Sequence, residues 1–134
     1  MARAGLQAFL LCDSMPIDQH GKTTVQGILG AIQCKSLPTT LASLGIFVRL
    51  SLPPLDSCDV EFEVRTPAGA IERAAQPQKV QSGDDGIAEL RVTIQAIPFR
   101  EAGRYVWSLI VDGSKVADYH FTVFAAETVR RPSI

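Results

Sequence analysis

Apolar and polar residues alternate one by one along several stretches of this chain, and this period of two constrains its fold more than any other feature. In residues 58–64 every second side chain is apolar and the intervening three are acidic. The alternation recurs in residues 88–96 and 117–123, and residues 105–111 carry four large apolar side chains in one phase. Successive side chains of a β-strand leave opposite faces. The pattern therefore predicts antiparallel strands, each with one face on a core.

Five further segments predict strands with a less regular pattern: residues 5–12, 23–34, 45–52, 70–74 and 79–82. In the clean segment 88–96 we expect one apolar phase to face the core throughout, and it consists of Ala88, Leu90, Val92, Ile94 and Ala96. Residues 36–44 lack a clear pattern and predict at most one short turn of helix.

Turn-forming residues separate these segments. Asp112-Gly113 lies between two apolar runs, which is a strong signal for a β-hairpin. Two prolines at residues 53–54 end one strand, and residues 66–69 (Thr-Pro-Ala-Gly) have proline at the second position of a turn. Seven or eight short strands at this spacing favour a β-sandwich or a barrel.

One local pattern favours the sandwich. Residues 101–107 (Glu-Ala-Gly-Arg-Tyr-Val-Trp) resemble the corner that enters strand F of immunoglobulin-like domains. Tyr105 matches the tyrosine whose hydroxyl bonds to the upstream backbone, and Trp107 stands where antibody domains have a cysteine. We therefore predict an all-β, immunoglobulin-like antiparallel two-sheet sandwich of about 7–8 strands, without the antibody disulfide.

The length and composition fit one soluble domain. We place it at residues 1–125, followed by a polar C-terminal tail at residues 126–134. The formal net charge of -1, with no run of like charges, argues against nucleic acid as a partner. No segment approaches the roughly 18 apolar residues of a membrane span, and the N-terminal apolar run is too short for a signal peptide. We expect a cytoplasmic protein with no membrane partner.

The chain as a whole resembles an uncharacterised bacterial family, a domain of unknown function made of small immunoglobulin-like β-sandwich proteins. The residues that carry the resemblance begin with Leu10-Leu11-Cys12-Asp13-Ser14 and Gly21-Lys22, continue with Gly27-Ile28-Leu29-Gly30, and end with Gly103, Tyr105 and Val111-Asp112-Gly113. Pro98 is slightly displaced from the family's pattern. The resemblance implies the fold and a bacterial cytoplasmic setting, and it implies no catalytic residue.

No set of residues has the spacing of a metal site. The candidates are Cys12, Cys34, Cys58, His20 and His120, and none of them form closely spaced pairs. We expect the three cysteines to be small, reduced core residues, which fits a reducing compartment.

Acidic loops offer a second kind of cation site. Asp13 and Asp18 fall in one connection, and Asp84 and Asp85 in another, where loop carboxylates at the end of a sandwich can bind calcium. Turn-forming aspartates explain the same residues through bonds to the local backbone, and we favour that interpretation. We predict no cofactor.

A hydrolase requires an activated nucleophile. Ser14, Ser108 or Cys12 can be paired with a histidine on paper, but no nucleophile-elbow motif is present. His120 falls on the polar phase of the last strand and His20 lies in a turn before Gly21, so we expect both on the polar surface and predict that the protein is not an enzyme.

Three apolar residues lie out of phase with the predicted core. Phe47 alternates with its apolar neighbours, and Val106 and Ile110 lie opposite the phase of Tyr105. A strand that is apolar on both faces indicates that its outer face is covered by a loop or by a partner. We therefore predict a non-catalytic protein-interaction domain that uses a sheet edge or an apolar sheet face, with another protein or a second copy as partner. A ligand-, carbohydrate- or calcium-binding sandwich is the alternative, and a hydrolase ranks last.

Overall fold

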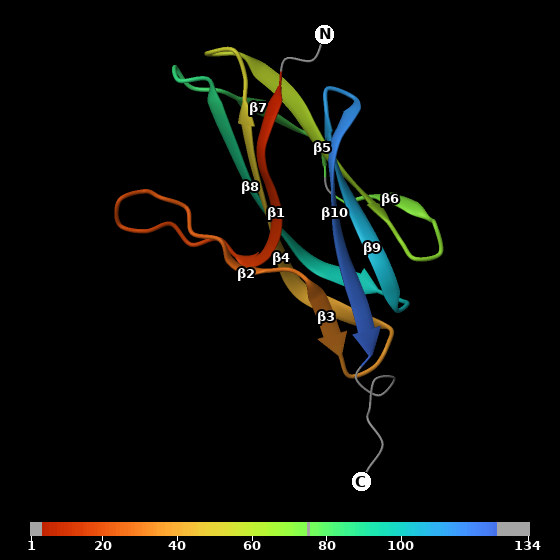
Figure 1. Ribbon diagram of the computed structural model, residues 1–134. Coiled ribbons are helices and arrows are strands. Elements are labelled where there is room, and N and C mark those ends of the chain that lie inside the picture. Colours follow the sequence, from red (N-terminus) through yellow and green to blue (C-terminus); the bar gives the residue numbers. More distant parts are fainter. Residues whose placement is uncertain (1–3, 75, 126–134) are drawn as a thin grey trace.

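The computed structural model describes residues 4–74 and 76–125, and all regular elements within these ranges are β-strands. They form two sheets that pack face to face (Figure 1). The strands of the first sheet are, in spatial order, β2 (Gln26–Ile28), β1 (Gly5–Ser14), β4 (Thr39–Ser51) and β8 (Ile87–Phe99).

The second sheet is the larger one. Its strands are, in spatial order, β3 (Ala31–Cys34), β10 (Ser114–Ala125), β9 (Gly103–Val111), β5 (Ser57–Arg65) and β6 (Ile71–Arg73), and β7 (Gln78–Gln81) also pairs with β5. All pairs are antiparallel except β3 with β10, which run parallel. The predicted two-sheet sandwich is thus confirmed, with ten described strands where the sequence predicts seven or eight. The tail predicted at residues 126–134 lies outside the described residues.

The core consists of the apolar phases that the alternation predicts. From the second sheet it takes Phe62, Trp107, Leu109 and Phe121, each no more than 2% exposed. From the first sheet it takes the phase of Ile46 on β4, which pairs with Val92 on β8 and with Leu11 on β1. Each fully buried side chain of this size contributes roughly 1.5–3 kcal/mol, so the two layers hold together without a disulfide.

Two predictions about the first sheet are wrong. Residues 39–44 are not a turn of helix but the first half of β4, where they pair with the end of β8. Ala96 does not face the core, because its φ of 59° is left-handed and interrupts the alternation of β8. Beyond it the buried phase continues with Ile97 and Phe99.

The corner predicted before β9 is present. The Tyr105 hydroxyl donates a hydrogen bond of 2.8 Å to the Glu101 carbonyl oxygen, four residues upstream. Its ring stacks on Phe121 with centroids 5.7 Å apart. The corner therefore connects the turn after β8 to the core.

Replacing Tyr105 with phenylalanine should test this connection, since it removes the hydroxyl and keeps the ring. We expect the free energy of unfolding to fall by about 1 kcal/mol, the usual value of one partly buried hydrogen bond. Urea denaturation of both proteins measures this difference. An unchanged midpoint with an unchanged slope would mean that the hydroxyl does not stabilise the fold.

Candidate functional site

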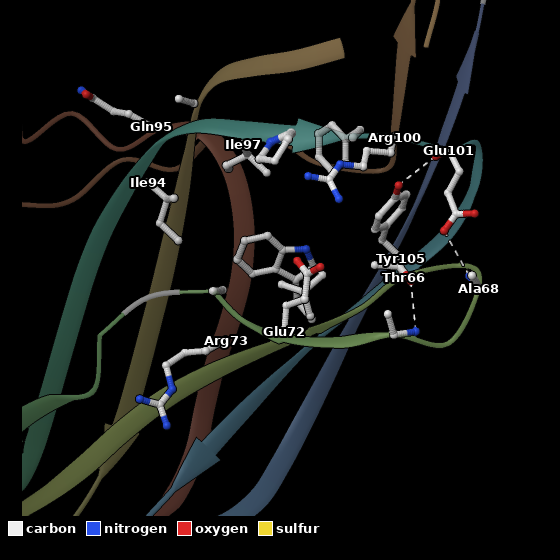
Figure 2. A pocket seen from close by; sticks show the side chains of 17 residues that line it. Thr66, Ala68, Glu72, Arg73, Ile94, Gln95, Ile97, Arg100, Glu101 and Tyr105 are labelled. Carbon is white, nitrogen blue, oxygen red and sulfur yellow. Dashed lines mark hydrogen bonds between the residues drawn. The ribbon is translucent and has the colours of Figure 1, made fainter. Parts of the chain in front are cut away.

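A cavity of about 420 Å³ opens on the side of the sandwich where β8 ends the first sheet and β6 lies at the edge of the second (Figure 2). Along β8 and the following turn it is lined by an unbroken run, residues 94–101. Side chains of a strand alternate between its two faces, so a cavity on one face is lined by every second residue. A cavity lined by consecutive residues lies instead along the edge of the strand. The cavity thus runs along the free edge of β8.

Small side chains explain why this region is hollow. Ala68, Ala70 and Ala74 line it from β6 and its flanking turns, and Ala96 lines it from β8. In addition, β6 is only three residues long and covers little of the gap between the sheets. Larger side chains at these four positions would fill the space as they do in the rest of the core.

One end of the cavity is closed where two turns meet. The backbone N–H of Ala68 donates to Glu101 Oε1 at 3.2 Å. Nearby, a Cβ added to Gly103 would lie 2.8 Å from the ring of Pro67, so the two turns are in close contact. The carboxylate of Glu101 is therefore engaged in holding the turn before β6.

Two charged side chains extend into the cavity from opposite sides. Figure 2 shows Glu72 rising from β6 and Arg100 reaching in from the turn after β8, whereas Arg73 points away from the centre. Arg73 is paired with Glu61 at 3.4 Å. Among the described residues, no hydrogen bond or ion pair engages the side chain of Glu72 or of Arg100. The lining thus carries one exposed carboxylate and one exposed guanidinium group whose side chains have no described protein partner.

Trp107 supplies the most unusual polar group of the lining. Its side chain is 1% exposed, and it is the single tryptophan of the chain. Its indole Nε1–H is buried and has no hydrogen-bond partner among the described residues. A buried donor without a partner costs about 1–3 kcal/mol, and indole N–H groups usually find an acceptor when buried.

The hydroxyl of Tyr105 lies at the closed end. Burial raises its pKa, and the negative charges of Glu101 and Glu72 add to that rise. The hydroxyl therefore stays protonated at neutral pH and keeps donating to the Glu101 carbonyl oxygen. It serves the corner and is not a free nucleophile.

Sequence reasoning missed this site. The apolar phase of residues 105–111 predicts Trp107 and Tyr105 in the core, which is correct, but Glu72 and Arg100 belong to segments without any chemical motif. The sequence does contain one signal: residues 68–75 are rich in alanine. Alanine side chains are small for a strand that must cover a core.

The interface residues predicted from the sequence lie elsewhere, on two different outer faces. Phe47 is on the outer face of the first sheet, where its cross-strand neighbours are Leu10 and Arg91. It is 9% exposed although it lies outside the core cluster, so it offers no open apolar surface.

Val106 and Ile110 are half-buried on the outer face of the second sheet. Val106 lies between Arg65 and His120 in the register. Ile110 occupies a similar position, with charged residues opposite it on both neighbouring strands. The stems of such long side chains cover apolar neighbours. These two residues and Phe47 cannot form one patch, and a partner at either face stays a prediction.

The metal candidates are dispersed. Within residues 4–74 and 76–125 no group of three or more His, Cys, Asp or Glu side chains is placed to hold a metal ion. Cys58 is a core residue as predicted, whereas Cys12 is buried on the outer face of the first sheet, where its Sγ lies close to Gly45. Cys34 is half-buried and donates to the Phe124 carbonyl oxygen.

Two of the loop aspartates form turns. Asp18 Oδ1 accepts hydrogen bonds from the backbone N–H groups of His20 and Lys22, and Asp85 Oδ1 accepts one from Ile87. This is the local bonding that the sequence favoured over calcium binding.

The hydrolase pairings do not assemble. His120 is exposed on the second sheet, while Cys12 and Ser14 belong to β1 of the first. Ser108 donates its hydroxyl hydrogen bond to Asp118 Oδ1 at 2.6 Å, not to an imidazole, and this bond lowers the pKa of Asp118. In the described part of the chain, no hydrogen bond joins either histidine to a predicted nucleophile.

Residues 7–124 match the family of unknown function DUF6941. The chain belongs to this family. The match confirms the resemblance to an uncharacterised family, and it extends over both sheets and the cavity. No match was found among curated proteins. Membership of DUF6941 therefore fixes no activity, and the bacterial and cytoplasmic setting stays a prediction.

Solved structures share the fold of this DUF6941 domain. An alkylpurine DNA glycosylase of Pseudomonas fluorescens, bound to DNA containing an abasic site analogue, aligns with 93% of this chain at a TM-score of 0.61 and 11% identity. A β-glucosidase of Erythrobacter marinus aligns with 90% at a TM-score of 0.55 and 13% identity. The chain spans 31% and 15% of those two proteins. At these identities the likeness shows the fold alone.

An immunoglobulin-like protein of Pseudomonas aeruginosa is similar in size, and the alignment covers 92% of this chain and 98% of that one, at 14% identity and a TM-score of 0.40. Among the described residues, none belongs to a helix with the length and apolar character of a membrane span.

Proposed function

We propose that this domain is a non-catalytic protein-interaction module whose contact surface is the side of the sandwich between β8 and β6. An extended segment of a partner protein lies along the free edge of β8 and inserts a side chain into the cavity. The observation that carries this proposal is the unpaired edge of β8 bordering a cavity of about 420 Å³. Free strand edges pair readily with extended peptides, and pockets beside them give specificity.

The shape of β8 supports this geometry. β8 pairs with β4 on one side, and its free edge is regular up to Gln95. Beyond that point Ala96 is left-handed and Pro98 lacks an N–H, two features that limit pairing at sheet edges. A partner segment paired along the regular part must therefore leave the edge beside the cavity. On the neighbouring edge strand, Ile71 is 56% exposed and offers apolar contact.

Carbohydrate and calcium binding are less well supported. Sugar sites use the open face of an aromatic ring, and here the three aromatic rings that line the cavity, Phe99, Tyr105 and Trp107, are only 2%, 3% and 1% exposed. Calcium requires six to eight oxygen ligands, and two of the loop carboxylates are engaged in turns.

The substitution Ala70→Arg tests the proposal. Ala70 lines the cavity and is exposed, so an arginine there fills the mouth without disturbing the core. We expect wild type to retain a specific protein from lysate of the source cells, and the variant to retain about tenfold less of it. Affinity capture with quantitative mass spectrometry measures the difference, and cross-linking places the contact.

Ala31→Arg is the matched control. Ala31 is an exposed alanine of β3, the opposite edge of the second sheet. It should leave the captured protein at the wild-type level. Equal capture by both variants, or no protein specific to the wild type, would exclude this side of the sandwich as the contact surface.

A further inference from the structure

We propose that the cavity between β6 and β8 is a receptor for an uncharged carboxamide, the side chain of an asparagine or glutamine of the partner protein. This inference rests on the proposed function and names the group that the partner inserts. It follows from one buried donor of the lining that has no described partner, Trp107 Nε1, and from two exposed charged side chains of the lining, Glu72 and Arg100.

The indole of Trp107 requires an acceptor. Nε1–H can only donate, and no described residue accepts from it. An ammonium or guanidinium group of a partner has no lone pair to offer, so a lysine or arginine side chain leaves this donor orphaned. A carbonyl oxygen satisfies it.

Glu72 requires a donor. Its carboxylate is exposed and acceptor-only when ionised, and no described hydrogen bond or ion pair engages it, so a donor of the partner would replace solvent there. Figure 2 shows its side chain directed from β6 toward the cavity. The NH₂ group of a carboxamide donates to such a carboxylate, whereas a partner carboxylate is repelled by it.

The charge balance favours a neutral occupant. The charged residues of the lining are two carboxylates, Glu72 and Glu101, and two guanidinium groups, Arg73 and Arg100, so the lining carries no net formal charge. A full charge transferred from water into this space has no net field to compensate its desolvation. A carboxamide carries both an acceptor and a donor and no charge, so it fits all the unpartnered groups.

The single tryptophan makes this testable without a known partner, because the indole N–H gives one signal in a ¹H–¹⁵N NMR spectrum. The probes are propionamide, propionate, propylammonium and 1-propanol, which share a three-carbon frame and differ in the polar group. We expect propionamide to move the indole proton downfield along a saturable curve, as a new hydrogen bond forms. Propionate and propylammonium, which carry a full charge, should bind about tenfold more weakly or not at all, and 1-propanol, which has a single oxygen to serve both the indole and the carboxylate, should bind more weakly than propionamide.

Two variants locate the partners. Glu72→Ala should weaken propionamide binding about tenfold, while Glu63→Ala, at an exposed position of the neighbouring strand β5, should leave it unchanged. Trp107→Phe removes the N–H and should abolish the shifts that propionamide causes at the backbone amides of Ala70 and Ala96. The dispersion of its spectrum shows at once whether that variant is folded.

An indole signal that propionamide leaves in place, or that all four probes move alike, would overturn the carboxamide assignment. This result is separable from the capture experiment. Loss of capture in Ala70→Arg together with an inert indole would keep the interaction surface and remove only its carboxamide specificity. A shift of the indole signal by propionamide without any captured protein would keep the carboxamide site and remove the protein-interaction surface.

Discussion

Replacing Trp107 with alanine should lower the free energy of unfolding by about 3–5 kcal/mol, the usual cost of removing a large aromatic side chain from a core. Trp107 is 1% exposed, lies on β9 in the middle of the second sheet, and lines the inner wall of the cavity. The space left by the indole would merge with the existing cavity. The neighbouring side chains could then relax little to fill the enlarged cavity. Urea denaturation followed by circular dichroism measures the loss.

Phe124→Ala is the matched control for this prediction. Phe124 is an aromatic residue of β10 in the same sheet, but it is half-buried and lies outside the core cluster. Its truncation should cost about 1 kcal/mol or less. If both variants lose the same stability, Trp107 is not a central element of the core and the position of the cavity must be reconsidered.

Trp107→Phe separates packing from hydrogen bonding. Because the indole Nε1–H has no partner among the described residues, phenylalanine loses no hydrogen bond there. It also removes the desolvation cost of an orphaned donor. We therefore attribute the whole of any destabilisation in this variant to lost packing.

The core was predictable from the sequence because one physical rule determines it. Strict alternation in residues 58–64 and 117–123 places Phe62 and Phe121 on the buried phase, and both are no more than 2% exposed. The hydroxyl bond of Tyr105 was equally predictable, since it is a local contact across four residues. Strand periodicity and contacts between residues close in sequence are the same in the sequence and in the folded chain. The fold prediction rests on these two features.

The change of phase in β8 was not predictable. Ala96 has a left-handed φ of 59°, a conformation for which alanine has no preference, and the sequence therefore shows only an unbroken apolar phase. Residues 39–44 pair with the far end of β8 across this change of phase. Tertiary pairing here overrides local propensity.

The cavity was not predictable for a related reason. A cavity is defined by volume that side chains leave empty, and Ala70 and Ala96 are brought to it from strands of different sheets. Glu72 reads in the sequence as an ordinary polar residue of an edge strand. Only the topology, which places β6 opposite the free edge of β8, gives these residues a common site.

The loop that leads into β8 depends on one glycine. Gly86 has a φ of +77°, and a Cβ built on it would lie 2.6 Å from the backbone oxygen of Leu52. In the same contact Leu52 donates its N–H to the Gly86 carbonyl oxygen at 2.7 Å. This bond fixes the end of β4 against the start of β8, so the edge strand of the proposed contact surface is anchored here.

Gly86→Ala should therefore lower the free energy of unfolding by about 3 kcal/mol, because the left-handed backbone costs about 1–2 kcal/mol for any L side chain and the clash with a backbone atom adds to it. Gly113→Ala isolates the first contribution, since Gly113 has a φ of +83° but open space where its Cβ would lie. That control should cost only about 1–2 kcal/mol. Chemical denaturation of the two variants side by side measures the difference, and equal losses would show that the β4–β8 junction tolerates a side chain and does not depend on this close approach.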